Sequence, residues 1–119
     1  MVHASLWDGA VLSRATITRF DHQDPVSLEQ RLQELDPAQP KVIAVDGVYS
    51  ITGEIAPLPE IADLADRFNA ALVVDDAHGL GVLGRDGRGV TDHFQLGDRV
   101  DLLCGSFSKS LASTGGFVA

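Results

Sequence analysis

The stretch Ala71-Leu72-Val73-Val74-Asp75-Asp76-Ala77-His78 decides the fold. Its apolar residues predict a short strand buried on both faces, which is typical of a parallel sheet, and the run ends at carboxylates and an imidazole. Residues 42–45 and 100–104 are two further apolar runs, and residues 115–119 indicate the start of one more strand. Such strands alternating with helices imply an α/β fold with a mostly parallel sheet.

Two helices are predicted between these strands. Ser27 is the expected N-cap of the first helix, with Gln30 as its capping-box partner, and leucines follow at helical spacing. Pro59 suits the first turn of the second helix, which is expected to run to about Phe68. The β-branched residues within 15–20 predict an additional strand. Residues 79–89 contain five glycines and are expected to be irregular.

Composition and charge exclude several classes of protein. The 119 residues suffice for one domain, and the net charge of −8 argues against nucleic acid or an anionic membrane as the main partner. No apolar run approaches the roughly 20 residues that span a bilayer, and the first residues carry no signal-peptide pattern. The single cysteine, Cys104, excludes an internal disulfide framework. These features predict a cytoplasmic protein.

Two strands are expected to deliver chemically active side chains to one edge of the sheet. Asp75 and His78 follow one predicted strand, and Lys109 follows another within Gly105-Ser106-Phe107-Ser108-Lys109-Ser110. Ligands of open α/β sheets bind beyond the carboxyl ends of the strands. The only other lysine, Lys41, begins a strand at the opposite edge, where it is expected to be solvated. Lys109 is therefore the candidate reactive amine.

A lysine, a carboxylate and hydroxyls at one sheet edge are suited to holding pyridoxal 5'-phosphate (PLP). Lys109 would form a Schiff base with the aldehyde of the cofactor, and burial would lower the pKa of its amine in the required direction. Asp75 would pair with the pyridinium nitrogen. Ser106 and Ser108 would donate hydrogen bonds to the phosphate. No set of residues indicates a metal site.

A competing signal lies in Gly79-Leu80-Gly81-Val82-Leu83-Gly84, which matches the dinucleotide-binding pattern G-x-G-x-x-G. That pattern requires the last glycine to open a helix whose N-terminus receives the pyrophosphate. Here the residues 85–89 that follow would break a helix. Asp75 and Asp76 would also place two carboxylates near the phosphates. A nucleotide-binding module is therefore the less favoured hypothesis.

Four segments together resemble the α-oxoamine synthase family of PLP-dependent enzymes. Residues 46–58 are similar to its pattern E-G-x-F/Y-S-M-x-G-D-x-A-P-L, and residues 75–89 are similar to D-D/E-A-H-x-x-G-x-x-G-x-x-G-R-G. Residues 105–109 resemble G-T-F/L-S/G-K, and residues 3–9 match H-A-S-x-x-D-G. The order and spacing agree over nearly the whole chain. Asp46 stands where the family usually has Glu, and Ser106 where it usually has Thr; both changes keep the chemistry.

The resemblance implies a fold and an activity. The fold would be the three-layer, mostly parallel sheet of the aspartate aminotransferase (fold type I) large domain. Residues 1–119 would be the central part of that PLP-binding domain, without its N-terminal segment and C-terminal small domain, so the chain alone is expected to be inactive. Family members, among them 8-amino-7-oxononanoate synthase and serine palmitoyltransferase, are homodimers. They condense an amino acid with an acyl-CoA, usually with loss of carbon dioxide.

The resemblance also implies roles for individual residues. His3 would stack on the pyridine ring, and His78 and Ser50 would contact the region of its phenolic oxygen. Lys109 would carry the cofactor and then move the proton of the substrate α-carbon. Two alternatives stay open beside this reading: a PLP-dependent aminotransferase with the same fold, and an inactive truncated copy of such an enzyme.

Overall fold

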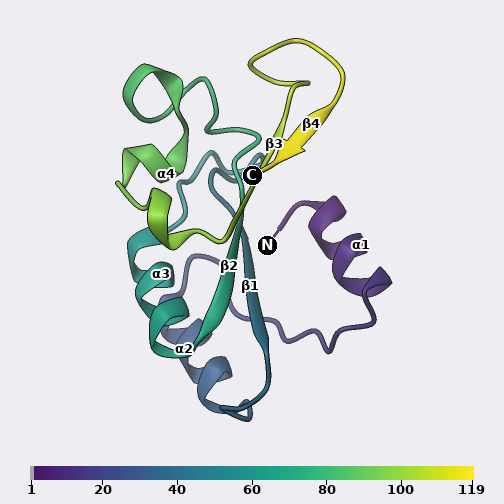
Figure 1. The fold of residues 1–119 in the computed structure, drawn as a ribbon, viewed down its shortest axis with the longest axis vertical. Helices are drawn as coiled ribbons and strands as arrows, with labels where there is room; N and C mark the ends of the chain where they lie inside the picture. The colour runs from purple at the N-terminus through teal and green to yellow at the C-terminus, as the bar shows by residue number, and fades with distance from the viewer. Residues whose placement is uncertain (1) are drawn as a thin grey trace.

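The computed structural model describes residues 2–119, in which four strands form a single sheet. In spatial order the strands are β1 (Lys41–Asp46), β2 (Ala70–Asp75), β3 (Leu102–Ser106) and β4 (Gly116–Val118). β1, β2 and β3 are parallel, whereas β4 runs antiparallel to β3. The carboxyl ends of the three parallel strands therefore meet at one edge of the sheet (Figure 1).

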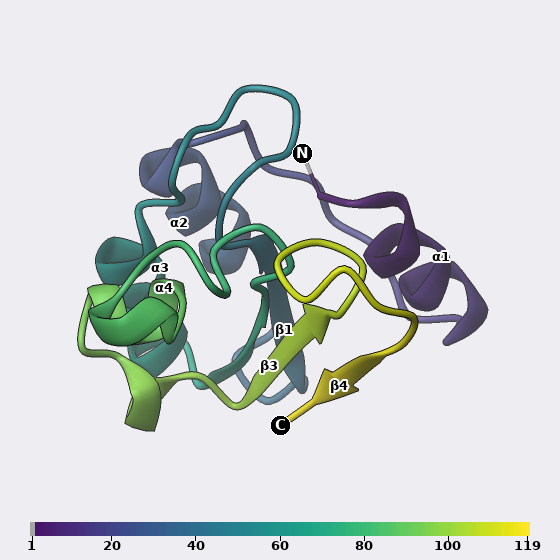
Figure 2. The ribbon, with the colours of Figure 1, turned by 90° about the horizontal axis from the view of Figure 1, so that it is seen from above.

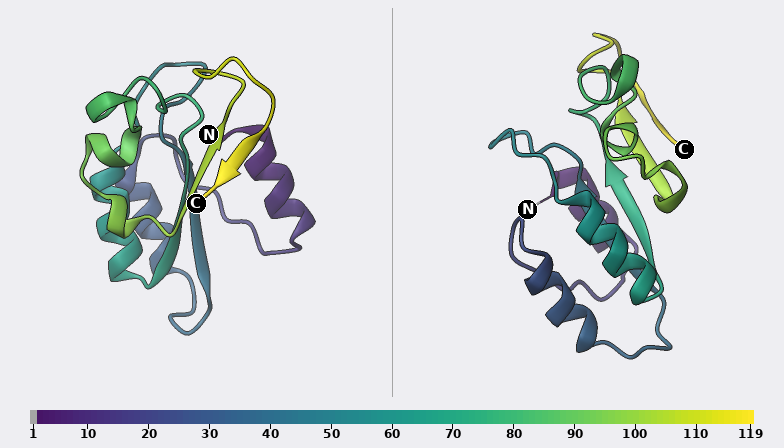
Figure 3. Two further views of the ribbon diagram at one scale, coloured as in Figure 1. Left: turned by 45° about the horizontal axis from the view of Figure 1, so that its top comes forward. Right: turned by 90° about the vertical axis from the view of Figure 1, so that its left-hand side faces the viewer.

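Helices lie on both sides of this sheet. Helices α2 (Pro25–Gln33) and α3 (Leu58–Arg67) cover one face, and α1 (Ala4–Leu12) lies on the opposite side (Figures 1 and 2). The short helix α4 (Val90–His93) follows the loop after β2, on the side of α3. Figure 3 shows α2 and α3 side by side against the sheet. The predicted α/β fold with a mostly parallel sheet is confirmed.

The hydrophobic core lies between the sheet and the pair α2 and α3. Side chains of β1 and β2 that point toward these helices are fully buried, and they pack against the apolar faces of both helices. The strands were expected to be buried on both faces. This expectation is wrong for the face of β1 that points away from α2 and α3. Val42 in β1 is 67% exposed, whereas Val45 in the same strand is 0% exposed. Helix α1 lies on that side of the sheet but has no buried residue of its own, and it leaves Val42 exposed.

The two faces of β1 allow a matched test of this packing. Replacing Val45 by alanine should lower the free energy of unfolding by about 2 kcal/mol, because two buried methyl groups are lost and a cavity remains. Replacing Val42 by alanine should change it by less than about 0.5 kcal/mol, because that side chain is already exposed. Denaturant unfolding of both variants measures the difference. Equal effects would contradict the placement of the core.

The elements with a strong apolar pattern agree with the structure. The predicted helix from Pro59 to about Phe68 corresponds to α3, whose C-cap is Phe68, and β1 and β2 contain the predicted apolar runs. The third strand lies two residues later than predicted. Asp101 precedes it and exchanges two hydrogen bonds with Leu72, its N–H donating to the carbonyl at 3.0 Å and its carboxylate accepting from the N–H at 2.7 Å.

Two predictions near the N-terminus are wrong. Residues 15–20 form no strand, because no neighbouring strand lies there to pair with them. The N-cap of α2 is Asp24 rather than Ser27, and its carboxylate accepts the N–H groups of Val26 and Ser27 at 2.9 and 3.0 Å. The Ser27 hydroxyl instead accepts the N–H of Asp21 at 3.0 Å. Helix α1 was not predicted, and none of its residues is buried.

Across residues 2–119, no helix combines the length and the apolar character that crossing a membrane would require.

Candidate functional site at the carboxyl edge of the sheet

The ends of β1, β2 and β3 bring two carboxylates and a thiol into neighbouring positions. Asp75 is the register partner of Asp46 on β1 and of Cys104 on β3. The Asp75 carboxylate accepts the N–H of Ala77 at 3.0 Å, and its main-chain carbonyl accepts the N–H of Gly47 at 2.7 Å. These bonds fix the half-buried Asp75 at the end of its strand. Burial, followed by the nearby Asp75 carboxylate, raises the pKa of the Cys104 thiol.

The loop after β3 presents two hydroxyls and an amine. The Ser106 and Ser108 hydroxyl oxygens lie 2.6 Å apart, and the Ser108 N–H donates to the Ser106 hydroxyl at 3.2 Å. The Lys109 amine donates to the Ser108 hydroxyl at 3.3 Å. Ser108 and Lys109 are exposed, so the expectation that the Lys109 amine is buried is wrong for this chain. The three predicted side chains therefore form one hydrogen-bonded group that is open to a ligand.

The loop after β2 packs against the loop after β3. The Ser110 hydroxyl donates to the carbonyl of Leu80, two residues beyond His78. A side chain at Gly81 would not fit, since an ideal Cβ there would lie 2.6 Å from the Ser110 Cβ. The structure thus places the half-buried His78 and the Lys109 group on two loops that contact each other directly (Figure 2).

His3 reaches the same edge through Asp46. The main-chain N–H of His3 donates to the Asp46 carboxylate at 3.0 Å, and the imidazole Nδ1 of His3 lies 2.8 Å from the Ser5 hydroxyl at the start of α1. Asp46 is only 7% exposed. Burial raises the pKa of its carboxyl, the hydrogen bond from His3 opposes this rise, and the Asp75 charge adds to it. Asp46 therefore holds the main chain of His3 at the end of β1, where Asp75 is its register partner, a role that the sequence pattern alone did not assign.

Ser50 lies in an exposed turn after β1. The turn is closed by a hydrogen bond of 2.8 Å from the Gly53 N–H to the Tyr49 carbonyl. His22 is half-buried beside this turn, where its Nε2 lies 3.0 Å from the Glu54 carboxylate and its ring meets that of Tyr49 edge to face. Burial raises the pKa of Tyr49 to about 12. The predicted contact of Ser50 with a cofactor stays a prediction.

Lys41 is not solvated as expected. The residue is 8% exposed, and its amine donates to the carbonyls of Pro37 and Gln39 at 3.0 and 2.8 Å. A lysine whose hydrogens are held by carbonyl groups in this way is a poor nucleophile, since it must release these bonds before it can react. Lys41 lies at the amino end of β1, opposite the predicted site.

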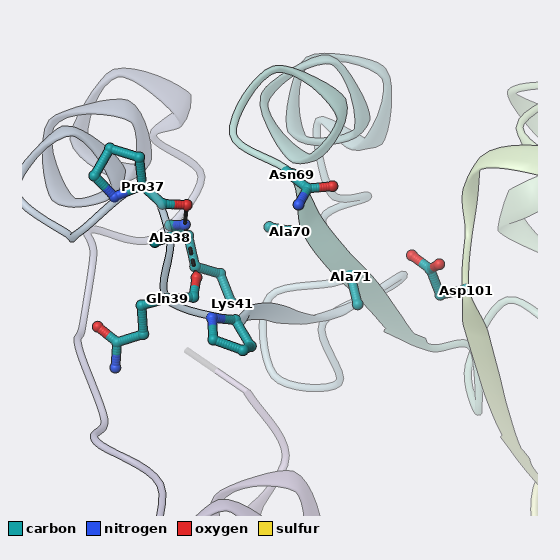
Figure 4. Close-up of a pocket in the computed structure, with 9 residues that line it drawn as sticks. Pro37, Ala38, Gln39, Lys41, Asn69, Ala70, Ala71 and Asp101 are labelled. Carbon is teal, nitrogen blue, oxygen red and sulfur yellow. Dashed lines mark hydrogen bonds between the residues drawn. The ribbon is translucent and has the colours of Figure 1, made fainter.

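Two cavities lie at the amino edge of the sheet rather than at the predicted site. The larger has a volume of about 390 Å³ and is bounded by residues 37–41, residues 69–71 and Asp101 (Figure 4). The smaller, of about 310 Å³, lies beside Arg99, whose guanidinium pairs with Asp63 and Asp66. Neither cavity is lined by any of the predicted site residues.

The loop after His78 does not have the geometry of a dinucleotide site. Only a single 3₁₀ turn, Arg85–Gly87, follows Gly84, and Asp86 within it has a positive φ of 55°. No extended helix therefore begins at the last glycine to receive a pyrophosphate. The structure supports the expectation that this segment is irregular, and it removes the main support for nucleotide binding.

This fold, with its lysine-bearing loop beside the carboxyl ends of parallel strands, is that of the aminotransferase class I and II family. All 119 residues match the model of that family, and the chain belongs to it. Serine palmitoyltransferase of Bacteroides ovatus is 53% identical over 117 residues, and 8-amino-7-oxononanoate synthase of Alkaliphilus metalliredigens is 53% identical over 118 residues. Each alignment covers 98% of this chain and 30% of the relative.

Solved structures agree with these relatives. The serine palmitoyltransferase of S. paucimobilis, with a bound PLP–myriocin aldimine, superimposes with a TM-score of 0.95 at 40% identity. The Sphingomonas wittichii enzyme gives 0.95 at 41% identity, and in both cases 98% of this chain and 29% of the other are covered. The resemblance to α-oxoamine synthases and the large-domain fold are confirmed. The chain spans about 30% of the length of the curated relatives it matches. That it is the central part of a larger domain stays a prediction.

Proposed function

We propose that this chain forms the cofactor-facing part of a PLP-dependent α-oxoamine synthase, which condenses an amino acid with an acyl-CoA and releases carbon dioxide. One observation carries the proposal: the Lys109 amine, with the Ser106 and Ser108 hydroxyls, is exposed on a loop that packs against the loop following Asp75 and His78. The named relatives favour acyl transfer over amino transfer. A homodimer in the cytoplasm is the matching expectation.

The residues present fit PLP. The Ser106 and Ser108 hydroxyls lie side by side and can both turn to donate to a phosphate. The Lys109 amine is held by a single hydroxyl and is free to bond an aldehyde. Asp75 has a fixed position and a negative charge with which it can retain a proton on a ring nitrogen. When bound, PLP supplies an electron sink for a carbanion at the substrate α-carbon.

The chain's own residues would then divide the remaining tasks. Lys109 would hold the cofactor covalently and, once released, move the proton of the substrate α-carbon. His3 would cover one face of the ring, positioned by its bond to Asp46. His78 and Ser50 would approach the ring oxygen from the loops after β2 and β1.

Borohydride trapping tests this proposal. The chain is incubated with PLP, reduced and digested, and the phosphopyridoxyl group is located by mass. In the folded chain we expect the side-chain label on Lys109 to exceed that on Lys41 at least tenfold. Because the Lys41 amine is bonded to carbonyls, its low reactivity alone could produce selectivity. A saturation curve must therefore accompany the ratio.

Two controls separate a built site from a merely accessible amine. In urea both lysines should react equally, and only a built site gives labelling of Lys109 that saturates at low PLP concentration in the folded chain. Replacing Ser106 and Ser108 together by alanine should raise the half-saturating PLP concentration at least tenfold, because the phosphate loses two donors. Labelling that rises linearly with PLP, unchanged by this double substitution, would refute the proposal. An aminotransferase would instead transfer the amino group to an oxo acid without releasing free CoA.

A further inference from the structure

The most deeply buried charged residue of the site region is Asp76, which the proposed chemistry does not use. It is 1% exposed and directly follows Asp75. Its N–H donates to the Cys104 carbonyl at 2.8 Å, which extends the pairing of β2 with β3 by one residue. One oxygen of its carboxyl accepts the N–H of Val90, at the start of α4, at 2.8 Å. The other oxygen, Oδ1, is buried and makes no hydrogen bond of good geometry among residues 2–119, although the Gly79 N–H is near enough to the carboxyl to lower its pKa.

Three segments approach the Asp76 carboxyl through glycines. An ideal Cβ on Gly79 or on Gly89 would overlap a carboxyl oxygen of Asp76. A Cβ on Gly47 would lie 3.0 Å from Oδ1 and 2.6 Å from a Val90 methyl group. The carboxyl therefore fills the space that side chains on the turn after β1 and on both ends of the glycine loop, residues 79–89, would occupy.

Stability does not explain a carboxyl in this position. A buried carboxyl with one unpartnered oxygen costs free energy, and an apolar side chain of similar size is often at least as stable. What the carboxyl adds is a directional hydrogen bond, which an apolar side chain cannot make. It binds one main-chain N–H across 14 residues and gives the glycine loop a fixed closing point. His78 lies at the start of that loop, and Leu80 within it binds Ser110 of the lysine loop.

We infer that Asp76 is a positioning residue of the site. Its carboxyl holds the turn at Gly47, the glycine loop and the start of α4 around the end of β2. It thereby fixes the position of His78. Through the contact of Leu80 with Ser110, it also fixes the position of the Lys109 loop. Only the last part of this inference, the effect on a bound cofactor, rests on the proposed function. The positioning itself concerns the chain without any ligand.

Two substitutions with side chains of similar shape separate the effect of the hydrogen bond from the effect of filling the space. Asp76→Asn keeps an oxygen that can accept the Val90 N–H, whereas Asp76→Leu fills the same space without an acceptor. Asp101→Leu is the matched control, because Asp101 also accepts a main-chain N–H, that of Leu72, but at the opposite edge of the sheet. Denaturant unfolding of each variant shows whether it is folded, and amide hydrogen exchange then reads the local effect.

We expect Asp76→Leu to speed exchange at Val90 and Leu80 at least tenfold and to raise the half-saturating PLP concentration for Lys109 labelling at least tenfold. Asp76→Asn should stay within about threefold of the original chain in both measurements. Asp101→Leu should affect exchange at Leu72 but leave labelling unchanged. Exchange in Asp76→Leu that matches the original chain would overturn the inference. If the original chain shows no selective labelling, the proposed function fails, while the exchange data still decide the role of Asp76.

Discussion

Replacing Gly89 by alanine should lower the free energy of unfolding by about 3 to 5 kcal/mol. Gly89 has φ 98° and ψ −173°, a region of backbone conformation that is almost exclusive to glycine and costs other residues about 1 to 3 kcal/mol. The added methyl group would also overlap a carboxyl oxygen of Asp76, which is enclosed on all sides and cannot retreat. Overpacking of this kind adds about 1 to 3 kcal/mol. Chemical denaturation followed by circular dichroism measures the loss.

Three other glycines separate the effect of the unusual backbone conformation from the effect of the overlap with Asp76. Gly79→Ala meets Asp76 without a positive φ, Gly53→Ala has a φ of 72° in open space, and Gly97→Ala has neither problem. We expect the smallest effect at Gly97, about 1 kcal/mol at Gly53, and more at Gly79, with Gly89 largest of all. A Gly89 variant no less stable than the Gly53 variant would show that Asp76 does not occupy the space assigned to it.

The stability of the chain should also depend on pH through Asp76. Burial raises the pKa of this carboxyl to about 6, above its ordinary value of 3.8. The folded chain therefore binds the proton more tightly than the unfolded chain, so protonation favours folding. The contribution of Asp76 protonation to the free energy of unfolding is fully present below about pH 4 and is lost as the pH rises through about 6. Its size is about 3 kcal/mol, since one pKa unit corresponds to about 1.4 kcal/mol.

Asp76→Asn isolates this contribution, because the variant lacks the titrating group but keeps every other one. The stability difference between the original chain and the variant should shift by about 3 kcal/mol between about pH 3 and about pH 7, with the variant gaining as the pH rises. Burial also raises the pKa of Asp46, but Asp46 is present in both chains, so its effect cancels in the stability difference. Unfolding curves that stay parallel over this range would mean that the Asp76 carboxyl titrates normally.

The parts of the fold that sequence predicts well are those governed by burial. β1, β2 and α3 have dense apolar patterns, and their packing against one another gives each pattern its partner. Helix α1 has no buried residue, so no periodic apolar face marked it in the sequence. The β-branched residues 15–20 have strand propensity, but a strand also needs a neighbour, and the sequence cannot supply that information.

In the candidate site, too, some features could be predicted from the sequence and others could not. Asp75 and Lys109 could be placed together because parallel strands carry their ends to one edge. The role of Asp76 could not be predicted, because it depends on Gly47, Gly79 and Gly89 converging from separate segments of the chain. In the sequence, Asp75 and Asp76 are two adjacent carboxylates that differ in nothing. Only the alternation of side chains at the end of β2 leaves one half-exposed at the edge and buries the other.

The hydrogen bonds of Lys41 have a practical consequence for handling this protein. An amine enclosed by the Pro37 and Gln39 carbonyls is shielded from acylating reagents, whereas Lys109 stands in the open. A succinimidyl ester applied to the folded chain should therefore distinguish its two lysine side chains. Coupling to a resin through lysine would anchor the molecule by its own candidate site, so any surface-based binding assay should be attached by another chemistry.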